Sequence, residues 1–135
     1  MMTIHRITKE DAWTLRHTVM WPDKPYDYIK LTDDAAGLHY GLIENGALQS
    51  VVSLFVNGTS AQFRKFATRT DQQGKGYGTA LLKHVLHEAA NYGAEIIWCN
   101  ARIDKADFYE RFGLRRTVKE FEKDGQLYVV MEKKV

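Results

Sequence analysis

The chain has 135 residues, of which 44% are hydrophobic and 27% charged, with a formal net charge of +2. This length suits one domain over residues 1–135 and leaves no room for a second. The mild charge argues against a nucleic-acid partner, and no apolar run approaches the roughly 18 residues that cross a bilayer, so no membrane partner is expected.

The first residues lack the apolar core of a signal peptide, so we expect a cytoplasmic location. Cys99 is the single cysteine, which excludes an internal disulfide and leaves too few thiolates for a typical zinc site. It follows Ile96-Ile97-Trp98 in an apolar stretch and is interpreted as a packing residue. We therefore expect no metal.

The N-terminal third predicts a strand at residues 3–7, followed by a helix and a lid. Thr8, with Asp11 three residues later, resembles a capping box that begins the helix, and Pro22 ends it. The expected buried stripe of this helix is Ala12, Leu15 and Val19. Residues 22–34 are interpreted as an irregular or short helical lid. Its aromatic side chains, which could line an acceptor site or form the core of the lid, are Trp13, Trp21, Tyr26 and Tyr28.

Three dipeptides, Asn45-Gly46, Asn57-Gly58 and Asp124-Gly125, lie between runs of strand-like composition and predict hairpin turns. The first two imply an antiparallel meander of three strands over residues 38–44, 47–56 and 61–68. The third implies a final hairpin that joins residues 115–121 to residues 127–133. The last strands could pair between two copies of the chain, which leaves a homodimer open.

A glycine-rich loop follows the third strand of the meander and opens an amphipathic helix that Gly93 ends. The loop reads Gln73, Gly74, Lys75, Gly76, Tyr77, Gly78 and Thr79. Unpaired N–H groups and the dipole at a helix N-terminus attract anions, and missing Cβ atoms allow close approach, so the loop predicts a pyrophosphate cradle. The spacing fits neither the dinucleotide fingerprint nor the P-loop, because Thr79 stands at the third glycine position and Gly76 follows Lys75.

A strand over residues 95–101 and a short helix over residues 105–112 follow. A strand, a helix and a second strand in succession predict one β-α-β crossover in an otherwise antiparallel sheet. The predicted fold class is α/β with a mixed, mostly antiparallel central sheet and flanking helices.

Two motifs together resemble the GNAT acyltransferases. The first is Gln73-x-x-Gly76-x-Gly78, which fits the acyl-CoA signature of that family. The second runs through Ala106-Asp107-Phe108-Tyr109-Glu110-Arg111-Phe112-Gly113-Leu114 and is similar to the family stretch A-x-x-F-Y-x-x-x-G-[F/L]. The resemblance covers about residues 38–133 and implies a splayed sheet with acetyl-CoA as the co-substrate.

The resemblance also assigns roles in binding the co-substrate. Backbone amides from Gln73 to Thr79, including those of Gly74, Lys75 and Tyr77, would hold the pyrophosphate, with the Thr79 hydroxyl and the Lys75 charge in support. Thr68 lies five residues before Gln73, where the family uses backbone groups to orient the acyl carbonyl, and Phe66 lies two residues earlier. Both could instead be ordinary sheet residues. A backbone N–H aimed at the developing oxyanion would stabilise it.

Tyr109 is the candidate catalytic acid, since it could donate a proton or a hydrogen bond to the thiolate that leaves the thioester. The alternative is a packing tyrosine. Asn100 could bind the pantetheine amides, although the place of the usual family asparagine is held here by Ile103. The sequence assigns no general base; His5, His39 and Glu44 could face the cleft, and Glu44 beside a turn is better explained as a solvated charge.

We therefore expect an acetyl-CoA-dependent N-acetyltransferase whose acceptor is a primary amine on a small molecule or peptide, attacked directly in a ternary complex. The alternative is a non-catalytic acyl-CoA-binding or sensor domain, for which Tyr109 would have no use. A toxin-like enzyme that acylates aminoacyl-tRNA would need a basic surface stripe, which the modest charge argues against.

Overall fold

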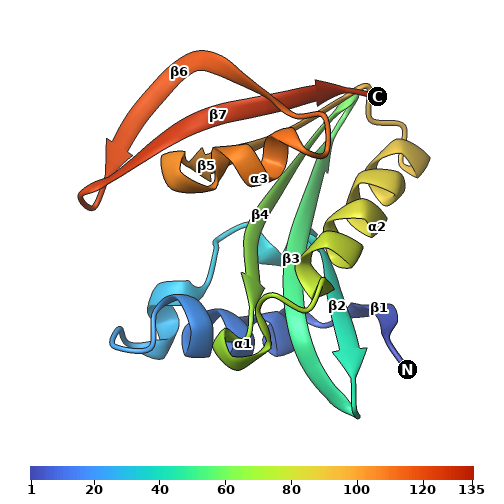
Figure 1. Ribbon diagram of the computed structural model, residues 1–135, viewed down its shortest axis with the longest axis vertical. Helices are drawn as coiled ribbons and strands as arrows, with labels where there is room; N and C mark the ends of the chain where they lie inside the picture. Colours follow the sequence, from blue (N-terminus) through green and yellow to red (C-terminus); the bar gives the residue numbers. More distant parts are fainter.

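The computed structural model describes residues 1–135 and contains seven strands, three α-helices and four short 3-10 helices (Figure 1). The strands are β1 (Thr3–Ile7), β2 (Leu38–Glu44), β3 (Ala47–Asn57), β4 (Ser60–Thr68), β5 (Ile96–Arg102), β6 (Arg115–Lys123) and β7 (Gln126–Lys134). The helices are α1 (Lys9–Met20), η1 (Tyr26–Ile29), η2 (Asp34–Ala36), η3 (Thr70–Gln72), α2 (Tyr77–Asn91), η4 (Ile103–Lys105) and α3 (Ala106–Glu110).

All strands lie in one sheet, in the order β1-β2-β3-β4-β5-β7-β6. Only β4 and β5 run parallel, and α2 connects them. The predicted β-α-β crossover inside a mostly antiparallel sheet is therefore confirmed.

The parallel pairing of β4 and β5 is short, and the two strands separate beyond it. This separation is the splay of the sheet. The pairing joins Ser60–Gln62 to Ile96–Trp98 and goes no further. Beyond it, β4 stays paired with β3 up to Thr68, while β5 stays paired with β7 up to Arg102. Figure 1 shows the two strands leaving a common end near the C-terminus and separating. Their facing edges therefore carry backbone groups without a strand partner.

Two of the three predicted turns have the expected centre. Asn45-Gly46 and Asp124-Gly125 have positive φ at both residues, as a type I′ turn requires. The middle prediction is wrong by one residue, because Asn57 is still paired with Ser60 at the end of β3. Gly58, with φ of 63°, is instead the first central residue, where a type II′ turn needs glycine.

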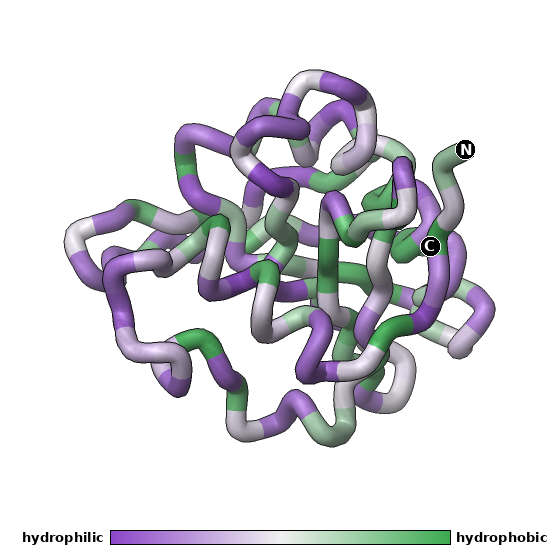
Figure 2. The backbone as a smooth tube through the Cα atoms, turned by 90° about the horizontal axis from the view of Figure 1, so that it is seen from below, coloured by the Kyte–Doolittle hydropathy of each residue, from purple (hydrophilic) through white to green (hydrophobic).

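The helices cover opposite faces of the sheet. On one face α2 buries Leu81, Leu82, Val85 and Ala89 in the main core. On the other, Leu15 of α1 packs in a smaller cluster with Val51 and Ala67. Figure 2 shows hydrophobic stretches mostly along the central strands and hydrophilic ones mostly around the outside.

The buried stripe of α1 differs from the prediction at one position. Ala12 and Leu15 are buried as expected, and Val19 is partly buried, but Arg16 is also fully buried. The predicted helix over residues 105–112 is shorter than expected and follows a 3-10 turn. No helix has the length and apolar character needed to cross a membrane.

Candidate functional site

The glycine loop gives α2 an uncapped N-terminus. Gly74 and Gly76 have φ of 81° and 83°, in the left-handed region that favours glycine. Gly76 is the N-cap, and no side chain caps the helix. The first intrahelical bond runs from the Ala80 N–H to the Gly76 carbonyl at 3.1 Å, so the N–H groups of residues 77–79 have no acceptor within the helix. This is the geometry that binds a phosphate.

Space in front of the loop is open. A Cβ added at Gly74 or Gly76 would meet no atom within 4 Å. A Cβ added at Gly78 would lie 3.1 Å from the Phe66 ring. Glycine at position 78 therefore lets Phe66 of β4 pack against the first turn of α2.

Side chains around the loop hold it to the end of β4. Gln73 Nε2 donates to the Thr68 carbonyl at 3.2 Å, and Lys75 Nζ donates to Gln72 Oε1 at 2.9 Å. The Thr68 hydroxyl lies 2.8 Å from the Ser50 hydroxyl of β3. The structure thus brings Phe66, Thr68 and residues 73–79 together at one end of the splay.

Tyr109 of α3 lies in an aromatic group that reaches back to the cradle. Its ring centroid is 5.7 Å from that of Phe63 and 5.4 Å from that of Phe108, which in turn lies 6.2 Å from Phe66. Burial raises the pKa of Tyr109 well above its ordinary value, and Cys99 adds to the effect. The hydroxyl therefore stays protonated and suits a donor rather than a base.

Asn100 is separate from this group. It is exposed on β5, paired with Val130, and by strand alternation lies on the face opposite the buried Cys99. Burial raises the pKa of Cys99 to about 12, as expected of a packing cysteine. The structure contains no group of three or more His, Cys, Asp or Glu side chains placed to hold a metal ion.

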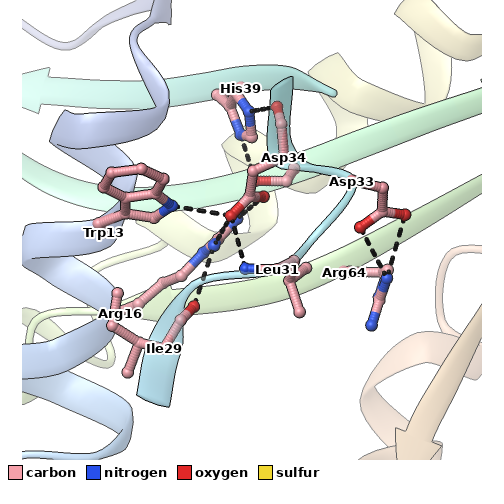
Figure 3. Close-up of polar contacts among 9 residues, drawn as sticks. Trp13, Arg16, Ile29, Leu31, Asp33, Asp34, His39 and Arg64 are labelled. Atoms are coloured by element: carbon pink, nitrogen blue, oxygen red, sulfur yellow. Dashed lines mark hydrogen bonds and ion pairs between the residues drawn. The ribbon is translucent and has the colours of Figure 1, made fainter. Parts of the chain in front are cut away.

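A buried ion pair, which the sequence analysis missed, joins α1 to the lid (Figure 3). Arg16 Nη1 lies 2.8 Å from Asp34 Oδ2, and Arg16 Nη2 lies 3.0 Å from Asp34 Oδ1. Arg16 also donates to the Ile29 carbonyl at 3.2 Å and to the Ser53 hydroxyl at 2.8 Å. Its only signal in the sequence was a basic residue next to the apolar stripe of α1.

Asp34 accepts two further hydrogen bonds, from Trp13 Nε1 at 2.7 Å and from the Leu31 N–H at 2.8 Å. Burial alone would raise the pKa of Asp34, but the hydrogen bonds from Arg16, Trp13 and Leu31 outweigh it and lower the pKa to about 2. The carboxylate is thus charged, and both of its oxygens accept hydrogen bonds from within the protein.

His39 cannot serve as the free base that the sequence left open. It is buried, with Nδ1 2.7 Å from the Ser53 hydroxyl and Nε2 2.9 Å from the Asp34 carbonyl. Both ring nitrogens are thus engaged, Nε2 with the lid and Nδ1 with β3. Glu44 forms an ion pair with the N-terminal amine at 3.1 Å, as expected of a turn charge.

The aromatic side chains in and beside the lid differ in their exposure and in their contacts. Trp13 is held by Asp34, whereas Tyr26 and Tyr28 are 41% and 44% exposed and so are not the core of the lid. Tyr28 donates to Asp124 Oδ2 at 3.3 Å, across 96 residues of sequence. The lid therefore touches the tip of the β6–β7 hairpin.

A second residue that the sequence analysis missed is Lys65 on β4. It has φ of 57° at an irregularity where the pairing with β3 shifts between Val51 and Ser53. It is partly buried, and burial lowers its pKa to about 8, with help from nearby positive charges. The signal in the sequence was the pair Arg64-Lys65 between two phenylalanines of the strand, Phe63 and Phe66.

Comparison with known proteins agrees with this geometry. Residues 4–135 match the family model of the acetyltransferase (GNAT) domain. An uncharacterized N-acetyltransferase of Bacillus subtilis, YitI, is 27% identical over 134 residues, which cover 93% of this chain and 90% of that protein.

Two solved structures show the same fold. The IAA acetyltransferase of Bacillus cereus superposes with a TM-score of 0.81 at 20% identity, covering 100% of both chains. A GNAT family acetyltransferase of Elizabethkingia anophelis, solved with acetyl-CoA bound, superposes with a TM-score of 0.80 at 18% identity, covering 99% of this chain and 98% of that one. With residues 4–135 matched by the family model and its cradle at the mouth of the crossover helix, the chain belongs to the GNAT family of acetyltransferases.

Proposed function

We propose that the protein transfers an acetyl group from acetyl-CoA to a primary amine, by direct attack in a ternary complex. The observation that carries the proposal is the uncapped N-terminus of α2, where three free N–H groups face open space at one end of the splay. Family membership and the neighbour with acetyl-CoA bound support the choice of co-substrate.

The cradle and the splay would bind different parts of acetyl-CoA. Backbone amides of residues 73–79 would bind the pyrophosphate, because the N-terminus of α2 is uncapped and the space beside Gly74 and Gly76 is open. The unpaired edge of β4 from Phe66 to Thr68 offers hydrogen-bonding groups to the pantetheine arm and the acyl carbonyl. Asn100 stays a weaker candidate for the pantetheine amides, since its side chain is exposed on the diverging part of β5.

Bound acetyl-CoA would supply the activated thioester carbonyl. In the overall change one C–N bond forms, one C–S bond breaks, the amine loses a proton and the sulfur leaves as a thiolate. Tyr109 would stabilise that thiolate. Because the raised pKa of Tyr109 makes full proton transfer to a thiolate uphill, a hydrogen bond from its hydroxyl is the better account of its role.

A calorimetric titration with acetyl-CoA, followed by a thiol-release assay over a panel of amines, tests the proposal. Micromolar binding of acetyl-CoA with no binding of NAD, together with amine-dependent thiol release, is the expected result. Binding without release for any amine would favour the non-catalytic acyl-CoA-binding alternative. Absence of binding to any CoA species would reject both.

A further inference from the structure

Lys65 is a partly buried cation with no ion pair and no hydrogen bond from its side chain. Its backbone φ of 57° is rare for a residue with a side chain and costs free energy. Half-buried lysines are normally paired, because desolvation of an unpaired ammonium is unfavourable. An unpaired, strained lysine at the irregularity of β4, next to the part of the strand that has no β5 partner, therefore needs a functional explanation.

The carboxylates around Lys65 are already engaged. The charges that act on it are those of Lys123, Arg16, Arg64 and Asp34. Asp34 is the only carboxylate among them, and Arg16 holds it in a two-pronged pair. Three cations and one neutralised acid leave an excess of positive charge around the Lys65 ammonium.

Neighbouring acids do not compensate for that excess. Asp33 lies 3.5 Å from Arg64, and Arg64 also stacks over the Phe55 ring at 5.7 Å. Asp124, next to Lys123 at the hairpin tip, accepts the hydrogen bond from Tyr28. Figure 3 shows Asp33 and Arg64 facing each other beside the Arg16–Asp34 pair.

Lys65 is close enough to charged groups of α1 and the lid to be affected by them. Its neighbour Phe66 packs toward α2 and the cradle, whereas Lys65 interacts with Arg16 and Asp34, which belong to α1 and the lid on the opposite face. Lys123 places the hairpin tip on the same side. The lid and the hairpin tip contact each other through Tyr28 and Asp124, and charged groups from both act on the ammonium.

We propose that Lys65 binds a carboxylate on the acceptor, so that the acceptor is an amino acid or another small molecule that carries both an amine and a carboxylate. This inference rests on the proposed acetyl transfer. A single ammonium matches a single negative charge, whereas recognition of a phosphate dianion usually employs an arginine fork or a helix N-terminus. Lys65 is a poorer candidate for the base, because its pKa of about 8 leaves it mostly protonated at neutral pH.

The test uses matched pairs of amines in which one carboxylate is replaced by its carboxamide, with rates expressed per unprotonated amine because the carboxamide also lowers the pKa of an α-amine. Each proteinogenic amino acid, β-alanine and γ-aminobutyrate is compared with its own carboxamide, both for kcat/KM in the thiol-release assay and for calorimetric affinity to CoA-saturated protein. For the best pair, wild type should prefer the carboxylate by about tenfold or more, as a charge-assisted hydrogen bond provides. The preference should fall as pH rises above about 8, where Lys65 loses its charge.

Variants of Lys65 distinguish a cation that binds the substrate carboxylate from a catalytic base. Lys65→Met should reduce the preference to within about twofold, chiefly through KM and binding affinity, while binding of acetyl-CoA is unchanged. Lys65→Arg should keep the preference, because guanidinium is always charged and cannot act as a base. Lys83→Met removes an exposed lysine from α2 and serves as the control that leaves the preference intact.

Failure of this inference is distinct from failure of the proposed function. Equal use of carboxylates and carboxamides by an active wild-type enzyme would overturn the role of Lys65 and leave acetyl transfer standing. Loss of all activity in Lys65→Arg would identify a base and also overturn it. If no amine releases thiol, the binding comparison still decides, and equal or absent binding of both members of every pair rejects the subsite.

Discussion

At the residue scale, Tyr109 combines a protonated hydroxyl with a position among rings that continue to Phe66 at the cradle. Tyr109→Phe removes only the hydroxyl, so we expect kcat to fall by about 10²-fold, the lower range for a lost proton or hydrogen-bond donor, with acetyl-CoA affinity unchanged. Steady-state thiol release and calorimetry measure the two quantities. Tyr92→Phe, at a tyrosine that is 49% exposed, is the control, and a fully active Tyr109→Phe variant would reject the role.

Gly76 allows a sharper comparison, because Gly93 at the other end of α2 has a similar φ, 87° against 83°, and similarly open surroundings. Valine at either position imposes comparable backbone strain, about 1–3 kcal/mol. Gly76→Val should also fill the cradle and reduce acetyl-CoA affinity by more than about 10²-fold, whereas Gly93→Val should lose stability alone. Thermal unfolding and calorimetry on both variants check this, and equal affinities would refute the cradle.

How far the sequence predicted these residues depends on the kind of signal. Glycines at positions 74, 76 and 78 could be identified because each has a backbone or contact requirement that other residues meet poorly. Arg16 and Lys65 could not be identified as important residues, because the groups that surround them lie far away in sequence. These groups belong to η2, β3 and β6. The role of a charged residue at a buried position can be inferred only when the fold shows which groups it contacts, or that it contacts none.

At the element scale, the lid has little regular structure of its own and depends on Arg16 for its attachment to α1. Arg16→Met leaves the Asp34 carboxylate buried without its main partner, and we expect a loss of about 3–5 kcal/mol in the free energy of unfolding. Urea denaturation measures this loss. Adding Asp34→Asn to Arg16→Met should recover part of it, since the uncompensated charge is gone, and a double variant no more stable than the single one would contradict this account.

Element boundaries show what periodicity can and cannot supply. The predicted bounds of β1 and β2 are both confirmed, and each strand ends directly before a turn or cap residue, Thr8 after β1 and Asn45 after β2. The lid consists of two 3-10 turns held by side-chain bonds to Asp34, which no local pattern records. The turn after β3 was misplaced because Asn57-Gly58 fits two turn types, and the strand pairing decides between them.

At the scale of the whole molecule, Asp34 makes the free energy of unfolding depend on pH. Its pKa falls from 3.8 to about 2 on folding, so its contribution is fully present above pH 4 and is lost as pH falls through about 2. The shift corresponds to about 2 kcal/mol. Urea denaturation of wild type and Asp34→Asn between pH 7 and pH 2 should show their free energies of unfolding converging by about that amount, and a constant difference would show that Asp34 does not couple folding to pH in this range.

The brevity of the parallel pairing has a mechanical consequence. Three residue pairs join β4 to β5, and beyond them each strand is paired only with its outer neighbour, β3 or β7, so little holds the two arms at a fixed angle. A small rotation at a hinge becomes a larger displacement at the open end. A substitution that tilts β4 against β5 at Ser60–Gln62 is therefore expected to change the width of the open end, although the residues at that end stay the same.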